Sequence, residues 1–175
     1  STTIHNDYND VTLYAKWIDA SGVSKFTDLD EDSWYYSYVA EIVAKGLMKG
    51  ISETEFAPDA TLTRGMFVTI LYRVEGEPEV EDGYDFTDVA EDQYYAAAVK
   101  WANANGIVKG VSETEFAPDA EVTREQMAAI ITRYADYKKI EVAGKDDVTY
   151  TDNEEVSEYA KEAVTPPVVG CVNTL

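Results

Sequence analysis

The chain has 175 residues, of which 34 are acidic and 14 are basic, so its formal net charge at neutral pH is -20. This charge argues against binding to nucleic acid or to an anionic membrane surface, because both ligands need a basic footprint on the protein. The sequence contains no apolar stretch of about eighteen residues and therefore predicts no membrane insertion. A hydrophobic content of 45 % predicts a folded core, and the start at Ser1 leads us to expect a piece of a longer protein.

The first segment with a clear pattern is NDVTLYAKWIDA (9–20), which places Val11, Leu13, Ala15 and Trp17 on one face of a possible strand. Alternation with a period of two is typical of a half-buried strand. The segment resembles the end of a Listeria–Bacteroides-type β-repeat of Gram-positive surface proteins, and the alternative is an isolated tail that mimics a strand. We expect its sheet partners to lie outside the chain and assign residues 1–20 to a β-repeat end or a linker.

The rest of the sequence repeats itself with an offset of 60 residues, as KGISETEFAPDATLTR (49–64) and KGVSETEFAPDAEVTR (109–124) show. The similarity extends on the N-terminal side to FTDLDEDSWYYSYVAEIVAKGLMKG (26–50), which aligns without a gap on residues 86–110. It also extends to MFVTILYRV (66–74), which we align one residue later on 127–135. A third copy starts at YTDNEEVSEYAKEAV (150–164) and lacks the FAPDA segment. Because a fixed period defines structural units, we predict two full repeats and an incomplete third, at 21–78, 79–142 and 143–175.

Each repeat is expected to consist of two helices joined by a structured connector. Helical spacing predicts the first helix, with Gly46 as its C-terminal cap, and Thr63 and Thr123 cap the second helices, Thr123 in a capping box with Gln126. The connector contains Phe56 or Phe116, which we expect to fill the gap between the two helices of a repeat. The predicted buried stripes of the second helices are Met66, Phe67, Ile70, Leu71 and Val74 in the first repeat and Met127, Ile130, Ile131 and Tyr134 in the second.

Together, FTDV, the aromatics that follow it, GIVKG and FAPDAEVTREQMA resemble S-layer homology repeats in residues, order and spacing. The resemblance covers residues 26–135 in two copies and 150–164 in part. It implies a mainly α fold in which three repeats pack about a pseudo-threefold axis with one helix of each in a central bundle. It also implies grooves between repeats that bind an anionic cell-wall polysaccharide, often one with a pyruvate ketal on an amino sugar.

The resemblance makes Arg64 and Arg124, in the Thr-Arg motif, the main candidates for polysaccharide binding. A guanidinium suits a carboxylate, and the free amides of the first helical turn also favour an anion. The alternative is a pair with Asp59 or Asp119, and for the binding role we expect Arg→Ala to change stability little. Where the family often has Glu two residues after this arginine, the sequence has Met66 and Gln126, so that carboxylate cannot contribute.

Three other sets of residues are weaker candidates for the same site. Lys49 and Lys109 add positive charge if they are more than solvated lysines. Trp34 and Tyr94 either stack on a sugar ring or staple the first helix to the core. Trp101 has Glu41 as its counterpart, so we expect it to be half-exposed or specific to one groove.

Metal sites and catalytic sites are not expected. Asp28, Asp30 and Asp32 alternate as in an EF-hand, but Ser33 and Val39 replace the required Gly and Glu, so we assign these aspartates to the positive end of the next helix. The one histidine, His5, lies in the N-terminal tail, and no phosphate-binding glycine loop is present. Cys171 is interpreted as a chance thiol. The sequence thus predicts no enzyme, no metal and no cofactor.

The function expected from these features is a non-catalytic module that tethers a surface protein to wall polysaccharide outside a Gram-positive-type cell. The alternative is a protein-binding or self-assembly module that uses the same fold without glycan. In the third repeat we expect one helix, from about Glu154 to Val164, that stops before Pro166 and Pro167. We expect the apolar faces left by this incomplete repeat to be covered by a symmetric homodimer or by the tail VVGCVNTL.

Overall fold

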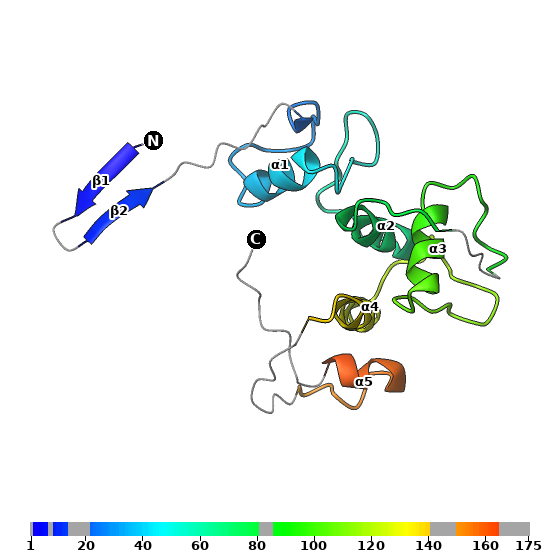
Figure 1. The fold of residues 1–175 in the computed structure, drawn as a ribbon. Helices are drawn as coiled ribbons and strands as arrows, with labels where there is room; N and C mark the ends of the chain where they lie inside the picture. Colours follow the sequence, from blue (N-terminus) through cyan, green and yellow to red (C-terminus); the bar gives the residue numbers. More distant parts are fainter. Residues whose placement is uncertain (1, 7–8, 14–21, 81–85, 141–149, 165–175) are drawn as a thin grey trace. The chain divides into compact units, whose positions relative to one another are not determined.

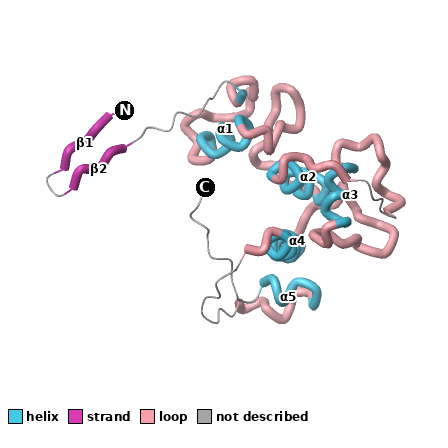
Figure 2. The backbone as a smooth tube through the Cα atoms, in the orientation of Figure 1, coloured by secondary structure: helices cyan, strands magenta, loops and turns pink. Residues whose placement is uncertain are grey.

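The computed structural model describes residues 2–6, 9–13, 22–80, 86–140 and 150–164 (Figure 1). Helices and loops make up most of these ranges (Figure 2), which confirms the mainly α class. Within the described residues, no helix has the length and apolarity needed to cross a membrane. The elements are β1 (Thr2–Asn6), β2 (Asn9–Leu13), α1 (Tyr36–Ala44), α2 (Arg64–Val74), α3 (Ala96–Ala104), α4 (Arg124–Tyr137) and α5 (Glu158–Val164).

The chain divides into two compact units, residues 1–60 and 61–175, and each has a hydrophobic core of its own. The division lies inside the first sequence repeat, between its connector and its second helix. Within unit 2, α2 packs against α3 and α4 packs against α5, so the second helix of a repeat contacts the first helix of the next. Packing units and sequence repeats therefore do not coincide. The repeat boundaries and the pseudo-threefold arrangement stay predictions.

The N-terminal strand is confirmed only in part, and our expectation about its partner is wrong. β2 covers Asn9–Leu13, and it pairs antiparallel with β1, which lies within the same chain. The register places Ile4 opposite Val11 and His5 opposite Asp10. The rest of the predicted strand, including Ala15 and Trp17, lies outside the described residues.

The predicted caps of the second helices are confirmed. The Thr63 hydroxyl accepts a hydrogen bond from the Met66 amide at 3.2 Å, and Thr123 and Gln126 form the reciprocal capping box. Because the two caps are 60 positions apart, the one-residue shift in our alignment of the second helices is wrong. The first helix ends as predicted, with Gly46 in the left-handed region at φ 71°.

The buried faces of the second helices differ from the predicted stripes. Val74 is 49 % exposed and Ile131 is 37 % exposed, whereas Val68, which we did not include, is fully buried in the core of unit 2. Phe67 and Val68 both belong to the core in which α2 packs against α3. Val74 lies two turns beyond Phe67 on the same face, but it is the last residue of α2 and is not part of that core.

The connectors are held by the aspartates of the FTD motifs, which do not lie at a helix terminus as we expected. The Asp28 carboxylate accepts hydrogen bonds from the amides of Phe56 at 3.0 Å and Ala57 at 2.7 Å. Asp88 binds Phe116 and Ala117 in the same way, at 2.9 and 2.6 Å. These bonds stabilise an unfavourable backbone, because Ala57 and Ala117 have φ values of 58° and 55°. The two amide bonds lower the pKa of Asp28 below its ordinary value.

The third repeat is ordered as a short helix that begins later than predicted, at Glu158 rather than near Glu154. Turns occupy residues 151–155, and the Ala160 amide bonds to the Ser157 carbonyl at 2.9 Å. Ala160 is fully buried within unit 2. Pro166, Pro167, Cys171 and the tail VVGCVNTL lie outside the described residues, and the homodimer stays a prediction.

Candidate functional site

A pocket of about 400 Å³ in unit 2 is lined by residues from all three sequence repeats. Its lining combines three cationic side chains with one amide, one aromatic ring and a small apolar floor, and it includes no aspartate or glutamate. The lining residues are Arg64 of α2, Lys109, Gly110 and Val111 of the connector, Gln126, Ala129, Ile130 and Arg133 of α4, and Tyr159 of α5.

Arg64 lies under this pocket and is only 5 % exposed. Its Nε donates to the Phe116 carbonyl at 2.9 Å, its Nη2 to the Lys109 carbonyl at 3.3 Å, and its Nη1 to Gln126 Oε1 at 3.2 Å. The guanidinium also lies over the Phe116 ring, 4.7 Å from its centroid. These contacts come from the repeat that follows Arg64, so they fix the side chain between two repeats.

The charge of Arg64 is not neutralised by these contacts, because the three acceptors are neutral oxygens. Burial lowers the pKa of Arg64, yet an arginine pKa lies so far above neutrality that the group stays charged. Its hydrogen bonds use three of the five guanidinium N–H donors, which leaves two. The Arg64 side chain is held by these three hydrogen bonds and not by the ion pair with an aspartate that was the alternative. Because the side chain is buried and hydrogen-bonded, we now expect its removal to lower stability, in place of the small change expected from the sequence.

The backbone amides of the first turn of α2, which we expected to be free to bind an anion, donate hydrogen bonds within the protein. The Arg64 amide donates to the Ala120 carbonyl at 2.9 Å and the Gly65 amide to the Pro118 carbonyl at 2.8 Å. The Met66 amide bonds to the Thr63 hydroxyl. Side chains therefore supply the positive charge of the pocket, and the helix N-terminus supplies none of its hydrogen bonds.

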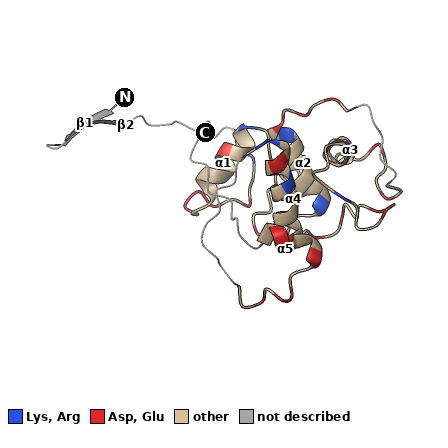
Figure 3. Ribbon diagram, turned by 60° about the horizontal axis from the view of Figure 1, so that its bottom comes forward, with Lys and Arg blue, Asp and Glu red and all other residues tan. Residues whose placement is uncertain are grey.

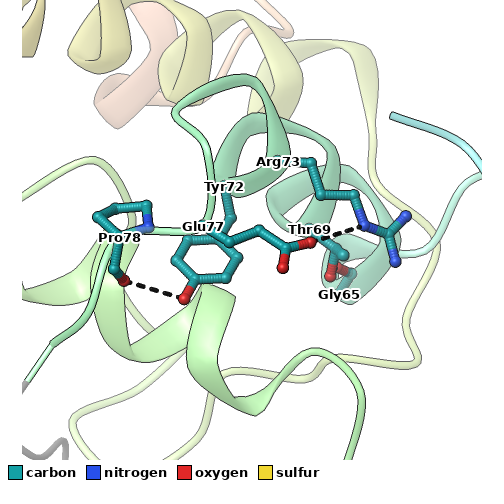
Figure 4. Close-up of polar contacts among 6 residues, drawn as sticks. All are labelled: Gly65, Thr69, Tyr72, Arg73, Glu77 and Pro78. Atoms are coloured by element: carbon teal, nitrogen blue, oxygen red, sulfur yellow. Dashed lines mark hydrogen bonds and ion pairs between the residues drawn. The ribbon is translucent and has the colours of Figure 1, made fainter. Parts of the chain in front are cut away.

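Arg133 is a residue of the pocket lining that sequence reasoning missed. It lies one helical turn beyond Ala129 and two turns beyond Gln126, on the face of α4 that forms the pocket wall. The shifted alignment hid its counterpart, Arg73, which stands 60 residues earlier. Arg73 is paired with Glu77 at 3.6 Å (Figure 4), whereas the described residues include no carboxylate within ion-pair distance of Arg133.

Tyr159 brings α5 to the pocket, and Glu125 binds its side chain there. The Tyr159 hydroxyl donates to Glu125 Oε1 at 2.8 Å, while the amide and the hydroxyl of Ser157 donate to the same carboxylate at 2.9 and 3.0 Å. The Ser157 amide, followed by the Tyr159 and Ser157 hydroxyls, keeps the pKa of Glu125 below its ordinary value. Burial and the neighbouring carboxylate raise the pKa of Tyr159. The phenol proton therefore stays on Tyr159, whose ring lines the pocket.

The other predicted site residues do not gather at this pocket. Lys109 lies at its rim as predicted, but Lys49 belongs to unit 1. Arg124 is exposed and is not part of the pocket lining, since the sequence has no third FAPDA segment to supply the carbonyls that Arg64 meets. Trp34 is 82 % exposed and Tyr94 is 58 % exposed, so neither staples its helix to the core.

Trp101 is a core residue, and the expectation that it is half-exposed is wrong. Its side chain is 1 % exposed. The rings of Tyr72 and Tyr137 pack against it with centroid distances of 5.7 and 5.8 Å. Glu41 stands at the corresponding place in the first repeat, and this residue belongs to unit 1. A ligand in the pocket would not meet Trp101.

The charge pattern around the pocket differs from that of the whole chain. In Figure 3 the ribbon is blue for Lys and Arg on α2 and α4, and red for Asp and Glu on loops as well as on some helices. A chain of net charge -20 thus presents a pocket walled by three cations. In the ranges that the structure covers, no group of three or more His, Cys, Asp or Glu is placed to hold a metal ion.

Comparison with known proteins gives a consistent result. Residues 25–65 and 85–128 match the model of the S-layer homology domain. An endoglucanase of Bacillus sp. (strain KSM-635) is 32 % identical over 145 residues, which are 82 % of this chain and 15 % of the endoglucanase. The surface-layer 125 kDa protein of Lysinibacillus sphaericus is 30 % identical over 157 residues, 89 % of this chain and 11 % of that protein. The middle cell wall protein of Brevibacillus brevis (strain 47 / JCM 6285 / NBRC 100599) is 30 % identical over 104 residues, 57 % of this chain and 10 % of that protein.

Proposed function

We propose that unit 2 binds an anionic cell-wall polysaccharide through the pocket of Arg64, Lys109 and Arg133. The chain belongs to the S-layer homology family, whose domains are non-catalytic modules that anchor proteins in the cell wall. The cell surface and cell wall are its location. The chain spans 15 % or less of the length of the three relatives described above.

The observation that carries this proposal is the charge of the pocket lining. An anion that approaches a chain of net charge -20 is repelled by most of its surface, so binding needs a local excess of cations. The three cations converge on one pocket without a neutralising acid in its lining. The apolar floor of Ala129 and Ile130 and the ring of Tyr159 supply surface for the carbon face of a sugar.

The three cations have different roles in the proposed complex. Lys109 is exposed and Arg133 is half-buried, so these two side chains can move onto a carboxylate of the polymer. Arg64 is fixed by its hydrogen bonds and supplies charge and two remaining N–H donors from beneath. A pyruvate ketal fits this arrangement because it carries one carboxylate on a compact, partly apolar ring.

Retention on purified wall sacculi tests the proposal. The chain is expected to sediment with sacculi that retain their secondary polysaccharide and to stay in solution with sacculi from which the polymer has been stripped. Equal retention on both would contradict it, and retention on neither, with self-association in light scattering, would favour the protein-binding alternative. Polymer whose carboxylates have been reduced to alcohols provides the matched control for charge.

A further inference from the structure

We infer that Glu125 is a positioning residue of the polysaccharide site, because its carboxylate fixes the ring of Tyr159 against which a sugar of the polymer packs. This inference rests on the proposed function and adds to it a recognition element other than positive charge. Glu125 is not part of the pocket lining, so it acts on the ligand through the tyrosine that it binds.

The Glu125 carboxylate has a defined orientation because both of its oxygens accept hydrogen bonds. Its Oε2 accepts from the Ser157 amide at 2.9 Å, and its Oε1 accepts from the Ser157 hydroxyl at 3.0 Å. The Tyr159 hydroxyl donates to the same Oε1 at 2.8 Å. Hydrogen bonds to an ionised acceptor are stronger than those between neutral groups. The phenol end of the ring is therefore tied to a strong acceptor whose own position is set by two further bonds.

Tyr159 is held at its hydroxyl while its ring stays accessible. The residue is 50 % exposed, although it lines the pocket. A side chain that is already fixed loses little further freedom when a ligand binds, and an aromatic face packs well against apolar surface such as the carbon face of a sugar. The pocket thus combines cations for a carboxylate with a ring that is in place before the ligand arrives.

The second repeat shows the same tyrosine without a glutamate beside it. Tyr95 and Tyr159 stand at the same distance from the start of their FTD and YTD motifs. Tyr95 packs against Gly65, belongs to the core and is 4 % exposed. A Cβ atom added to Gly65 would lie 3.0 Å from the Tyr95 ring, which leaves no room for a longer side chain with the ring in that place. A glutamate at residue 125 therefore goes with a tyrosine that is exposed at the pocket, and a glycine with one that is buried.

Charge alone predicts the opposite effect for Glu125. Removing a negative charge near three cations cannot weaken their attraction for an anion. A loss of polymer affinity on removal of this carboxylate would therefore come from the released ring. Glu162 provides the matched control, because it belongs to α5, is exposed and does not line the pocket. Glu125→Ala and Glu162→Ala remove the same charge, but only the first removes the acceptor of Tyr159.

The experiment measures the affinity of the full chain for purified acidic wall polysaccharide in a double-mutant cycle of Glu125→Ala and Tyr159→Leu. We expect each single variant to bind about fivefold more weakly, the scale of one aromatic contact. Because Glu125 acts through Tyr159, the double variant should bind no more weakly than Tyr159→Leu. Glu162→Ala should bind at least as tightly as the wild type. Additive losses in the double variant, or unchanged affinity of Glu125→Ala, would overturn the inference.

A spectroscopic readout separates contact with the ligand from a role in folding alone. With isotope-labelled tyrosine rings, the resonance that is absent from Tyr159→Leu is assigned to Tyr159. Saturating polymer should shift this resonance in the wild type, and the shift should be smaller in Glu125→Ala at equal occupancy. A Tyr159 resonance that does not move in the saturated wild type would overturn the inference and leave the proposed function intact. A wild type that does not bind acidic polymer, or binds its carboxyl-reduced form equally, would contradict the proposed function itself.

Discussion

The carboxylate of Glu125, at the first turn of α4, accepts a hydrogen bond from the hydroxyl of Tyr159 in α5, 34 residues later, at 2.8 Å. The same carboxylate binds the amide and the hydroxyl of Ser157. One side chain of α4 thus binds both α5 and the residue that precedes it. In the first repeat the place of Glu125 is taken by Gly65, whose Cα lies so close to Tyr95 that an added Cβ would be 3.0 Å from the ring. The pair α2 and α3 is thus joined by close packing at Gly65, whereas the pair α4 and α5 is joined by a hydrogen bond from Tyr159 to Glu125.

Removal of the phenol group is expected to loosen α5 without removing the pocket. In Tyr159→Phe the ring stays and the bond to Glu125 is lost. The hydrogen-exchange protection of the α5 amides should fall about fivefold, the scale of one exposed hydrogen bond. Protection within α3 is the internal control and should not change. Unchanged protection of α5 would show that the packing of Ala160 alone holds this helix.

The attachment of α5 is expected to weaken in acid. The hydrogen bonds from Ser157 and Tyr159 lower the pKa of Glu125 in the folded state below its ordinary value of 4.5. Because the detached form binds a proton more readily, the bonds stabilise α5 fully above that ordinary value, and the stabilisation is lost as the pH falls through the lowered pKa. Hydrogen exchange or limited proteolysis of residues 150–164, followed from neutral pH to about pH 3, measures the loss of this attachment. Glu125→Gln should remove most of the pH dependence.

Arg64 is expected to matter for stability as well as for binding. Arg64→Ala leaves the Phe116 and Lys109 carbonyls without donors and exposes the Phe116 ring. We expect a loss of about 2–4 kcal/mol in the free energy of unfolding of unit 2, the usual cost of removing several buried hydrogen bonds. Arg124→Ala is the matched control, because Arg124 is exposed at the same helix position, and it should change the free energy by less than about 0.5 kcal/mol. Equal effects in urea unfolding would contradict the structural role of Arg64.

The second connector allows two opposite changes to be compared. Asp88→Ala removes both bonds to the Phe116 and Ala117 amides and should destabilise unit 2 by about 1–2 kcal/mol. Ala117→Gly should be neutral or stabilising by up to about 1 kcal/mol, since glycine adopts the φ of 55° without steric cost. Thermal and urea unfolding of both variants test this. A destabilised Ala117→Gly would show that the Ala117 methyl group is needed for packing.

Repeats, helix caps and the family of this chain could be predicted from the sequence, because they depend on local chemistry. Thr63 and Thr123 cap helices through bonds to residues three positions away, and a fixed period reveals itself by comparison alone. The partners of Asp28 and Asp88 lie 28 and 29 residues away, so a local reading assigned these aspartates to the nearest helix end. The distant contacts of Arg64 escaped prediction for the same reason.

The sequence could predict the type of candidate site and some of its residues, but not its full lining. Arg64 and Lys109 line the pocket as expected, but Arg133 was hidden by a one-residue alignment shift. Trp101 was misjudged because its counterpart Glu41 suggested an exposed position, whereas the rings of Tyr72 and Tyr137 enclose it. These two rings come from helices on either side of α3 in sequence, and sequence patterns do not state which helices become neighbours. The groove between repeats becomes visible only when those helices are placed.

The most direct measurement is the affinity of the full chain for purified acidic wall polysaccharide, by calorimetry, for the wild type and for Lys109→Gln combined with Arg133→Gln. Both residues lie at the surface of the pocket, so the folded structure should be kept, which circular dichroism and urea unfolding check. Lys161→Gln, at an exposed residue of α5 outside the pocket, is the control for the removal of a positive charge elsewhere on the surface. We expect the double variant to bind at least about tenfold more weakly, the loss of one or more charge-assisted hydrogen bonds, and Lys161→Gln to bind as the wild type does. Unchanged affinity of the double variant would contradict the proposal that this pocket holds the polymer.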